Sequence, residues 1–117
     1  MVLTTLHAGS AHEAISRLIL MARFGMDLPT SVIEMQIASA LDFVLMSRRT
    51  ADGSRYLASL SSVGESSEGG VELHECVRFD EIDRSWELIE EPDFVEQGLH
   101  EGVLDEEEVE AWRGCLA

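Results

Sequence analysis

The chain has 117 residues, 45% of them hydrophobic, and its mean hydropathy is +0.03. These values fit one soluble domain, or one domain with an appendage. No apolar run approaches the roughly 18 residues of a membrane span, and the N-terminus has no basic region followed by a small-residue cleavage site. We therefore expect a cytoplasmic protein without direct membrane insertion.

The net charge of -15 is unevenly distributed along the chain. Residues 1–63 hold five acids and five arginines, whereas residues 64–117 hold 18 acids against three arginines. The acidic half would repel nucleic acid at physiological salt, so no nucleic-acid partner is expected. Together with the patterns below, the imbalance predicts a globular part at residues 1–80 and an acidic, mainly helical appendage at residues 81–117.

The cysteines and histidines do not form a metal-binding pattern. Cys76 and Cys115 are far apart in the sequence without C-x-x-C spacing, which is typical of free cytosolic thiols. His74 and Cys76 share a face of a predicted strand, but two ligands do not make a zinc site. We predict no structural metal.

The first half of the chain begins with a strand and two helices. Residues 1–6 are short and apolar, as in a strand buried within a parallel sheet. Ser10 followed by Glu13 has the spacing of a capping box, which predicts a helix over residues 11–24 with Gly25 as its stop. Pro29 suits the first turn of a second helix, which is predicted to end near Leu41.

After the second helix, the hydrophobic period changes from helical to strand-like. Residues 42–49 and 56–63 predict a hairpin around Asp52 and Gly53. A third strand at 71–79 completes an antiparallel meander, with Cys76 on the more polar of its two faces. Residues 86–89 could form a last short strand, after which Pro92 opens a helical stretch and Asp105 caps a final helix.

Four linked motifs within about residues 2–80 resemble the C-terminal half of the type II and type IV secretion ATPases, most closely the tight-adherence pilus and conjugation branch. They are "TTLHAGSAHEAISRL", "MDLP", "QIASALDFVLMSRR" and "DGSRYLASLSSVGE", in this order. The resemblance implies an α/β fold with a partial RecA-like core: one buried strand, two helices and a three-stranded antiparallel meander. It also implies a hexamer that works at the inner-membrane secretion platform.

The resemblance assigns roles to two residues. His7 falls on the family's histidine box, T-x-H-A, where the imidazole lies near the γ-phosphate of ATP. Arg17 matches a position on the following helix where a phosphate-facing or intersubunit role is expected, and an ordinary surface salt bridge is an equal alternative. Gly9 and His12 depart from the asparagine and arginine that are common in the family.

Several parts of an ATPase site are missing from this sequence. There is no G-x-x-x-x-G-K-[ST] motif, all eight basic residues are arginine, and no apolar strand ends in magnesium-binding acids. The family binds ATP and Mg²⁺, but we expect no cofactor and no catalysis for the isolated chain. Its expected partners are further copies of itself or a P-loop-containing ATPase half, which would cover the edge of the strand at residues 2–6.

Two alternatives stay open. The chain could be a stand-alone interaction or regulatory module that docks on an ATPase ring or on another protein through its helix-plus-hairpin body, while its acidic tail contacts a basic partner. It could also be a fold unrelated to ATPases, in which case His7 is only a polar residue next to an apolar strand.

Overall fold

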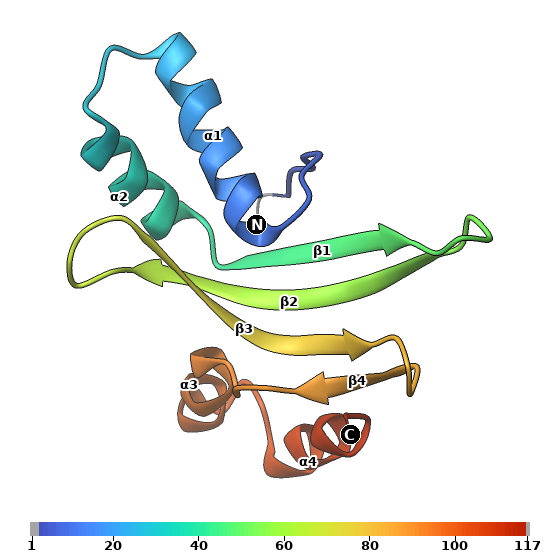
Figure 1. The fold of residues 1–117 in the computed structure, drawn as a ribbon. Coiled ribbons are helices and arrows are strands. Elements are labelled where there is room, and N and C mark those ends of the chain that lie inside the picture. The colour runs from blue at the N-terminus through green and yellow to red at the C-terminus, as the bar shows by residue number, and fades with distance from the viewer. Residues whose placement is uncertain (1–2, 117) are drawn as a thin grey trace.

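The computed structural model describes residues 3–116 and has a mixed α/β architecture (Figure 1). Its helices and strands are α1 (Ala11–Gly25), α2 (Thr30–Ala40), β1 (Phe43–Arg49), β2 (Arg55–Glu65), β3 (Val71–Asp80), β4 (Ser85–Leu88), α3 (Asp93–Glu101) and α4 (Glu106–Gly114). The α1–α2 pair lies at one end of the molecule and the α3–α4 pair at the other, with the sheet between them.

The sheet is an antiparallel meander with the strand order β1-β2-β3-β4. The predicted hairpin and third strand are confirmed, and the last short strand expected around residues 86–89 is present as β4. The sheet therefore has four strands where the predicted fold class counted three. The fourth strand lies beyond residue 80, and its Trp86 pairs with Phe79 of β3. The sheet thus includes residues on both sides of the predicted division at residue 80.

The predicted buried strand at residues 1–6 is not formed in the part that the structure describes. Residues 3–8 adopt no regular secondary structure, and Leu3 is 84% exposed, whereas Met1 and Val2 lie outside the described residues. The described sheet contains only antiparallel pairs, so no RecA-like parallel sheet is present within residues 3–116. A strand needs a neighbour for its amides and carbonyls, and none of these strands pairs with this segment.

The two N-terminal helices agree closely with the sequence prediction. α1 begins after Ser10, whose hydroxyl accepts a hydrogen bond from the Glu13 amide at 3.1 Å, and it ends at Gly25. α2 begins immediately after Pro29, which therefore occupies the N-cap and not the first turn. Ile33 of α2 is only 1% exposed and anchors this helix, which contacts β2 and β3.

A bulge interrupts the alternation that the sequence predicted for β3. Ser61 of β2 pairs with Glu75 and Leu60 with Val77, so Cys76 is the extra residue between the two pairs. Cys76 and Val77 are consecutive in the chain and both are buried, which corrects the expected position of Cys76 on a polar face. A bulge allows this because it locally breaks the two-residue period of the strand.

The acidic end of the chain folds back onto the sheet. The ring of Phe94 on α3 meets Phe43 of β1 edge-on, with 5.1 Å between the centroids. Asp105 and Glu108 form a complete capping box at the start of α4, as the sequence predicted for Asp105. Arg113 on α4 makes a two-pronged ion pair with Glu91, at 2.8 to 3.0 Å, and so ties this last helix to the segment before α3.

The molecule is open for its size. Its radius of gyration is 16.2 Å, whereas a compact chain of this length has about 13 Å. The most deeply buried large side chains, Ile33, Cys76 and Val95, come from α2, β3 and α3. Between residues 3 and 116, no helix is long and apolar enough to cross a membrane.

Candidate functional site

His7, the predicted phosphate sensor, lies in the irregular segment that leads into α1. Its side chain is exposed, and within residues 3–116 the imidazole has no hydrogen bond or ion pair. Its backbone carbonyl, in contrast, accepts a hydrogen bond of 2.8 Å from Nη1 of Arg17. The backbone of the segment is therefore tied to the helix, while both ring nitrogens stay available to a ligand.

Arg17 connects the segment to α1 through a second contact. Its Nε donates to Oε1 of Glu13 at 3.1 Å, and its Nη2 lies 2.9 Å from the same oxygen. The two side chains are 51% and 42% exposed, so an i,i+4 pair of this kind stabilises the helix by only about 0.3–0.5 kcal/mol. In this structure Arg17 positions the His7 segment, and its contact with a phosphate stays a prediction.

The predicted capping box at the start of α1 is wrong in the role of Glu13. Its carboxylate accepts a hydrogen bond from the Gly9 amide at 2.8 Å and does not reach back to the Ser10 amide. A Cβ at Gly9 would lie 2.8 Å from the same carboxylate oxygen, so the glycine permits this close approach. Amides at a helix start attract anions, and Glu13 already supplies one there.

Arg48 adds a contact that spans the chain. Its Nη2 donates to the carbonyl of Gly9 at 3.4 Å, across a separation of 39 residues. This contact holds the His7 segment near β1, so the segment is fixed by α1 on one side and by the sheet on the other. Sequence reasoning missed Arg48 because nothing in a strand arginine indicates which distant carbonyl it will meet. Glu13, by contrast, has the i,i+4 spacing to Arg17 that could have indicated their pairing.

The groups with shifted pKa values lie elsewhere. Hydrogen bonds from Thr50 and from Ser54 lower the pKa of Asp52 to about 2 in the β1–β2 turn. The hydrogen bond to Glu81, at 2.5 Å, raises the pKa of Tyr56. None of these groups adjoins His7 in the sequence, and each shift is explained by a hydrogen bond that holds a turn or a strand in place.

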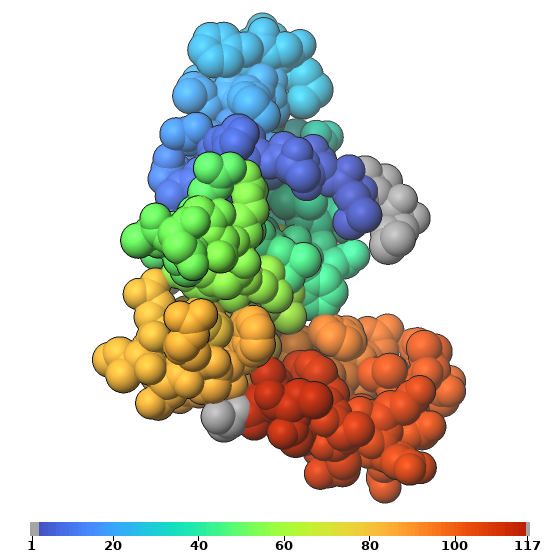
Figure 2. All heavy atoms as spheres, turned by 90° about the vertical axis from the view of Figure 1, so that its right-hand side faces the viewer, coloured from blue at the N-terminus to red at the C-terminus, as the bar shows by residue number. Residues whose placement is uncertain are grey.

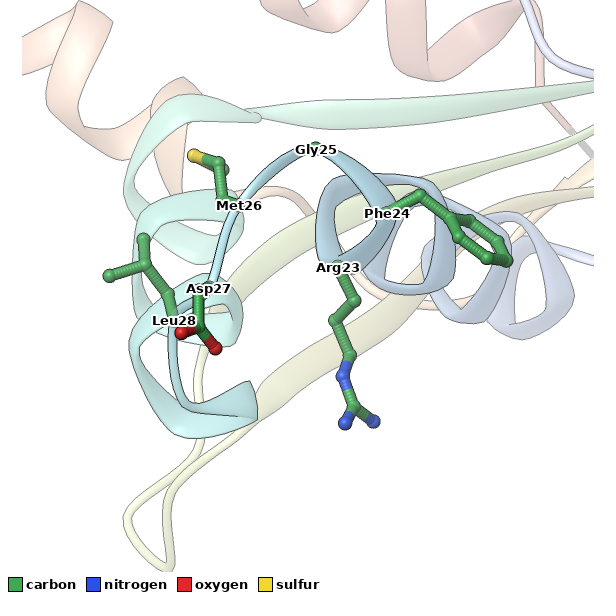
Figure 3. Close-up of a pocket in the computed structure, with 6 residues that line it drawn as sticks. All are labelled: Arg23, Phe24, Gly25, Met26, Asp27 and Leu28. Atoms are coloured by element: carbon green, nitrogen blue, oxygen red, sulfur yellow. The ribbon is translucent and has the colours of Figure 1, made fainter.

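Two surface hollows lie within residues 3–116 away from the predicted site, and neither is lined by His7 or Arg17. One is lined by Arg23 to Leu28 at the far end of α1 (Figure 3), and the other by Asp93, Glu96, Gln97 and His100 on α3. Within the described range of 3–116, no group of three or more His, Cys, Asp or Glu side chains is placed to hold a metal ion. Cys76 is buried, Cys115 is exposed, and both are free thiols.

Comparisons with known proteins give no match. No protein-family model matches the chain, and no match was found among curated proteins or among solved structures. The phosphate-related roles expected of His7 and Arg17 therefore depend on the four sequence motifs alone. The structure adds only the contacts that these two residues make within the chain.

Proposed function

We propose that this chain is the C-terminal part of a secretion ATPase of the tight-adherence pilus or conjugation type, in which His7 senses the γ-phosphate of ATP. The observation that best supports the proposal is the contrast at His7: its backbone is fixed by Arg17, at 2.8 Å, while its imidazole is exposed and has no partner within residues 3–116. Because the ring makes no contact of its own within residues 3–116, it can donate a hydrogen bond to a phosphate oxygen without first breaking another contact.

In this proposal the isolated chain is inactive. Phosphoryl transfer requires backbone amides and a lysine around the phosphates, together with a hydroxyl and a carboxylate on magnesium. The chain has no lysine, and the Gly9 amide is already bound by the carboxylate of Glu13. ATP and Mg²⁺ would be held by a P-loop-containing half, and His7 would act only when the two halves meet.

The same proposal predicts that residues 3–6, which precede α1, pair with a strand of the P-loop half. Leu3 is 84% exposed and residues 3–6 pair with no strand of the described sheet. We expect this segment to become a strand when the P-loop half offers it a neighbouring edge, because its unpaired amides and carbonyls are then satisfied. The assembled protein would be an oligomer at the cytoplasmic face of the inner membrane, beside the secretion platform.

A reconstitution experiment tests the role of His7. Titration calorimetry of the chain alone with Mg-ATP should give no binding heat. Addition of a P-loop half from an ATPase of this branch should restore hydrolysis, and His7→Ala should then lower kcat by about 100-fold, the cost of removing one hydrogen-bond donor to the transition state. The matched control is His100→Ala, because His100 is also exposed but lies on α3. Substantial ATP binding by the chain alone, or equal effects of the two substitutions, would contradict the proposal.

A second function is favoured by the separation of charge in this molecule. The acidic residues concentrate in the half that contains β3, β4, α3 and α4, whereas the half with α1 and α2 is neutral. A stand-alone module could therefore bind an ATPase ring through its apolar helices and a basic partner through its acidic end. The DNA upstream of the first codon distinguishes the two functions: a reading frame that continues into a P-loop favours the first, and a ribosome-binding site next to an intact ATPase gene favours the second.

A further inference from the structure

The far end of α1 and the connection to α2 expose a run of large apolar side chains, which we call the α1 patch. It consists of Leu20, Met21, Phe24, Met26 and Leu28, which are 38–85% exposed. Phe24 is the most exposed of them at 85%. Leu20, Met21 and Phe24 follow helical spacing on one side of α1. Met26 and Leu28 belong to the connection, and Figure 3 shows their side chains on the other side of the helix end from Phe24.

The exposed surface of the molecule is larger than that of a compact monomer of this mass. The accessible surface is 8648 Å², whereas a compact monomer of 13.0 kDa exposes about 6,300 Å². The excess of about 2,300 Å² exceeds the roughly 800 Å² that each partner contributes to a standard interface. The chain therefore has enough unburied surface for a stable contact with another molecule.

The distribution of charge favours a second copy of this chain as the partner. The patch belongs to the electrically neutral residues 1–63, and Figures 1 and 2 place it at the end of the molecule opposite the acidic α3 and α4. A second copy that meets the first at this patch would bring two neutral apolar surfaces together. The acidic ends would point away from each other, so their repulsion would be small at physiological salt.

Two charged residues beside the patch complement each other. Within residues 3–116, neither Arg23 nor Asp27 has an ion-pair or hydrogen-bonded side-chain partner. Both line the hollow at the end of α1, and Figure 3 shows their side chains extending to the same side of the backbone. In a twofold interface every contact occurs twice, once in each direction. Arg23 of one copy can therefore pair with Asp27 of the other, while Asp27 of the first copy pairs with Arg23 of the second.

We propose that the α1 patch is a self-association surface, at which two copies of this chain meet about a twofold axis with Phe24 at the centre and two reciprocal Arg23–Asp27 pairs at the rim. This inference does not depend on the proposed ATPase function. Aromatic side chains at the centre of an interface contribute most of its affinity, and charged pairs at the rim determine orientation and partner choice.

Sedimentation velocity over a range of micromolar concentrations tests the proposal. The wild-type chain should reversibly form a dimer, and Phe24→Ala should raise its dissociation constant by about 30-fold. Ile82→Ala is the matched control, because Ile82 is 93% exposed but lies in the acidic half between β3 and β4. A wild-type chain that stays monomeric would overturn the proposal, and this holds also if the patch binds a different protein.

Charge exchange tests the twofold geometry. Arg23→Asp places two acids opposite each other, and Asp27→Arg places two arginines opposite each other, so each single variant should dimerise weakly. A mixture of the two variants should form a heterodimer as tight as the wild type within about threefold, because both Arg–Asp pairs are restored across the axis. Circular dichroism confirms that the variants are folded. A dimer that is insensitive to Phe24→Ala, or a mixture that shows no recovery, would overturn this interface.

Discussion

The short helices α3 and α4 each bury one apolar residue almost completely, whereas the long helix α1 leaves Leu20, Met21 and Phe24 exposed at its far end. Val95 and Val109 are 2% and 4% exposed, although α3 and α4 have only nine residues each. α1 is longer, with 15 residues, and buries only Ala14 and Ile15 near its start. The difference teaches that helix length does not determine burial, because an apolar helix face is covered only where another element faces it.

Local chemistry contributes to this difference. Leu104 packs against Gly98, where an added Cβ would lie 2.6 Å from the leucine side chain, and so the chain turns tightly after α3. Gly102 supplies the left-handed conformation for that turn, with φ of +75°. α1 ends without such a turn, and its connection to α2 continues as an exposed apolar segment.

The largest effect is expected from the one residue of α2 that is fully buried. Ile33→Ala should lower the free energy of unfolding by about 2–5 kcal/mol, because it removes a buried side chain and leaves a cavity. Phe24→Ala, on the exposed face of α1, should change the stability of the dilute, monomeric protein by less than about 0.5 kcal/mol. Urea unfolding measures both values, and similar losses for the two variants would contradict the contrast between buried and exposed helix faces.

A glycine pair tests whether the turn after α3 depends on backbone conformation alone. Gly102→Ala should cost about 1–2 kcal/mol, because a Cβ is disfavoured in the left-handed region. Gly114→Ala, at the end of α4, should instead stabilise the protein by up to about 1 kcal/mol. Within the described residues 3–116, a Cβ at either position meets no atom within 4 Å, so packing does not contribute. Thermal unfolding should show opposite signs, and two changes of the same sign would contradict this account.

A smaller effect is expected from the ion pair that holds α4. Arg113→Gln removes the contacts of 2.8 to 3.0 Å with Glu91 and should speed amide hydrogen exchange in α4 while leaving α1 unchanged. Arg23→Gln is the matched control, because Arg23 has no ion-pair partner in the described part of the chain. Equal exchange in α4 for the two variants would show that the pair does not hold this helix.

The smallest effect concerns pH and the β1–β2 turn. The pKa of Asp52 falls from 3.8 to about 2 because the carboxylate accepts hydrogen bonds from Thr50 and Ser54. A lowered pKa stabilises the fold above pH 4, and this contribution disappears as pH falls toward 2. Asp52→Asn should therefore slightly reduce the loss of unfolding free energy as the pH falls from 4 to 2. An unchanged profile between pH 4 and 2 would contradict this role.

Short-range patterns predicted much of the secondary structure. The caps at Ser10 and Asp105 and the turn around Gly53 each involve residues within four positions of one another, and all three are present. The candidate site was predicted only in part, because the Arg17–Glu13 spacing is local but the contact from Arg48 to Gly9 is not. No periodicity could have revealed that Cys76 forms a bulge, since the bulge depends on the register with β2.

The sequence by itself determined the helices, the hairpin turn and the segregation of charge, because propensity, capping and net charge are properties of neighbouring residues or of simple sums along the chain. Only the tertiary structure decided that residues 3–8 stay irregular, that β4 joins the sheet and that the far end of α1 stays uncovered. Each of these outcomes depends on whether a distant segment provides a neighbour, and burial and strand pairing exist only between such neighbours.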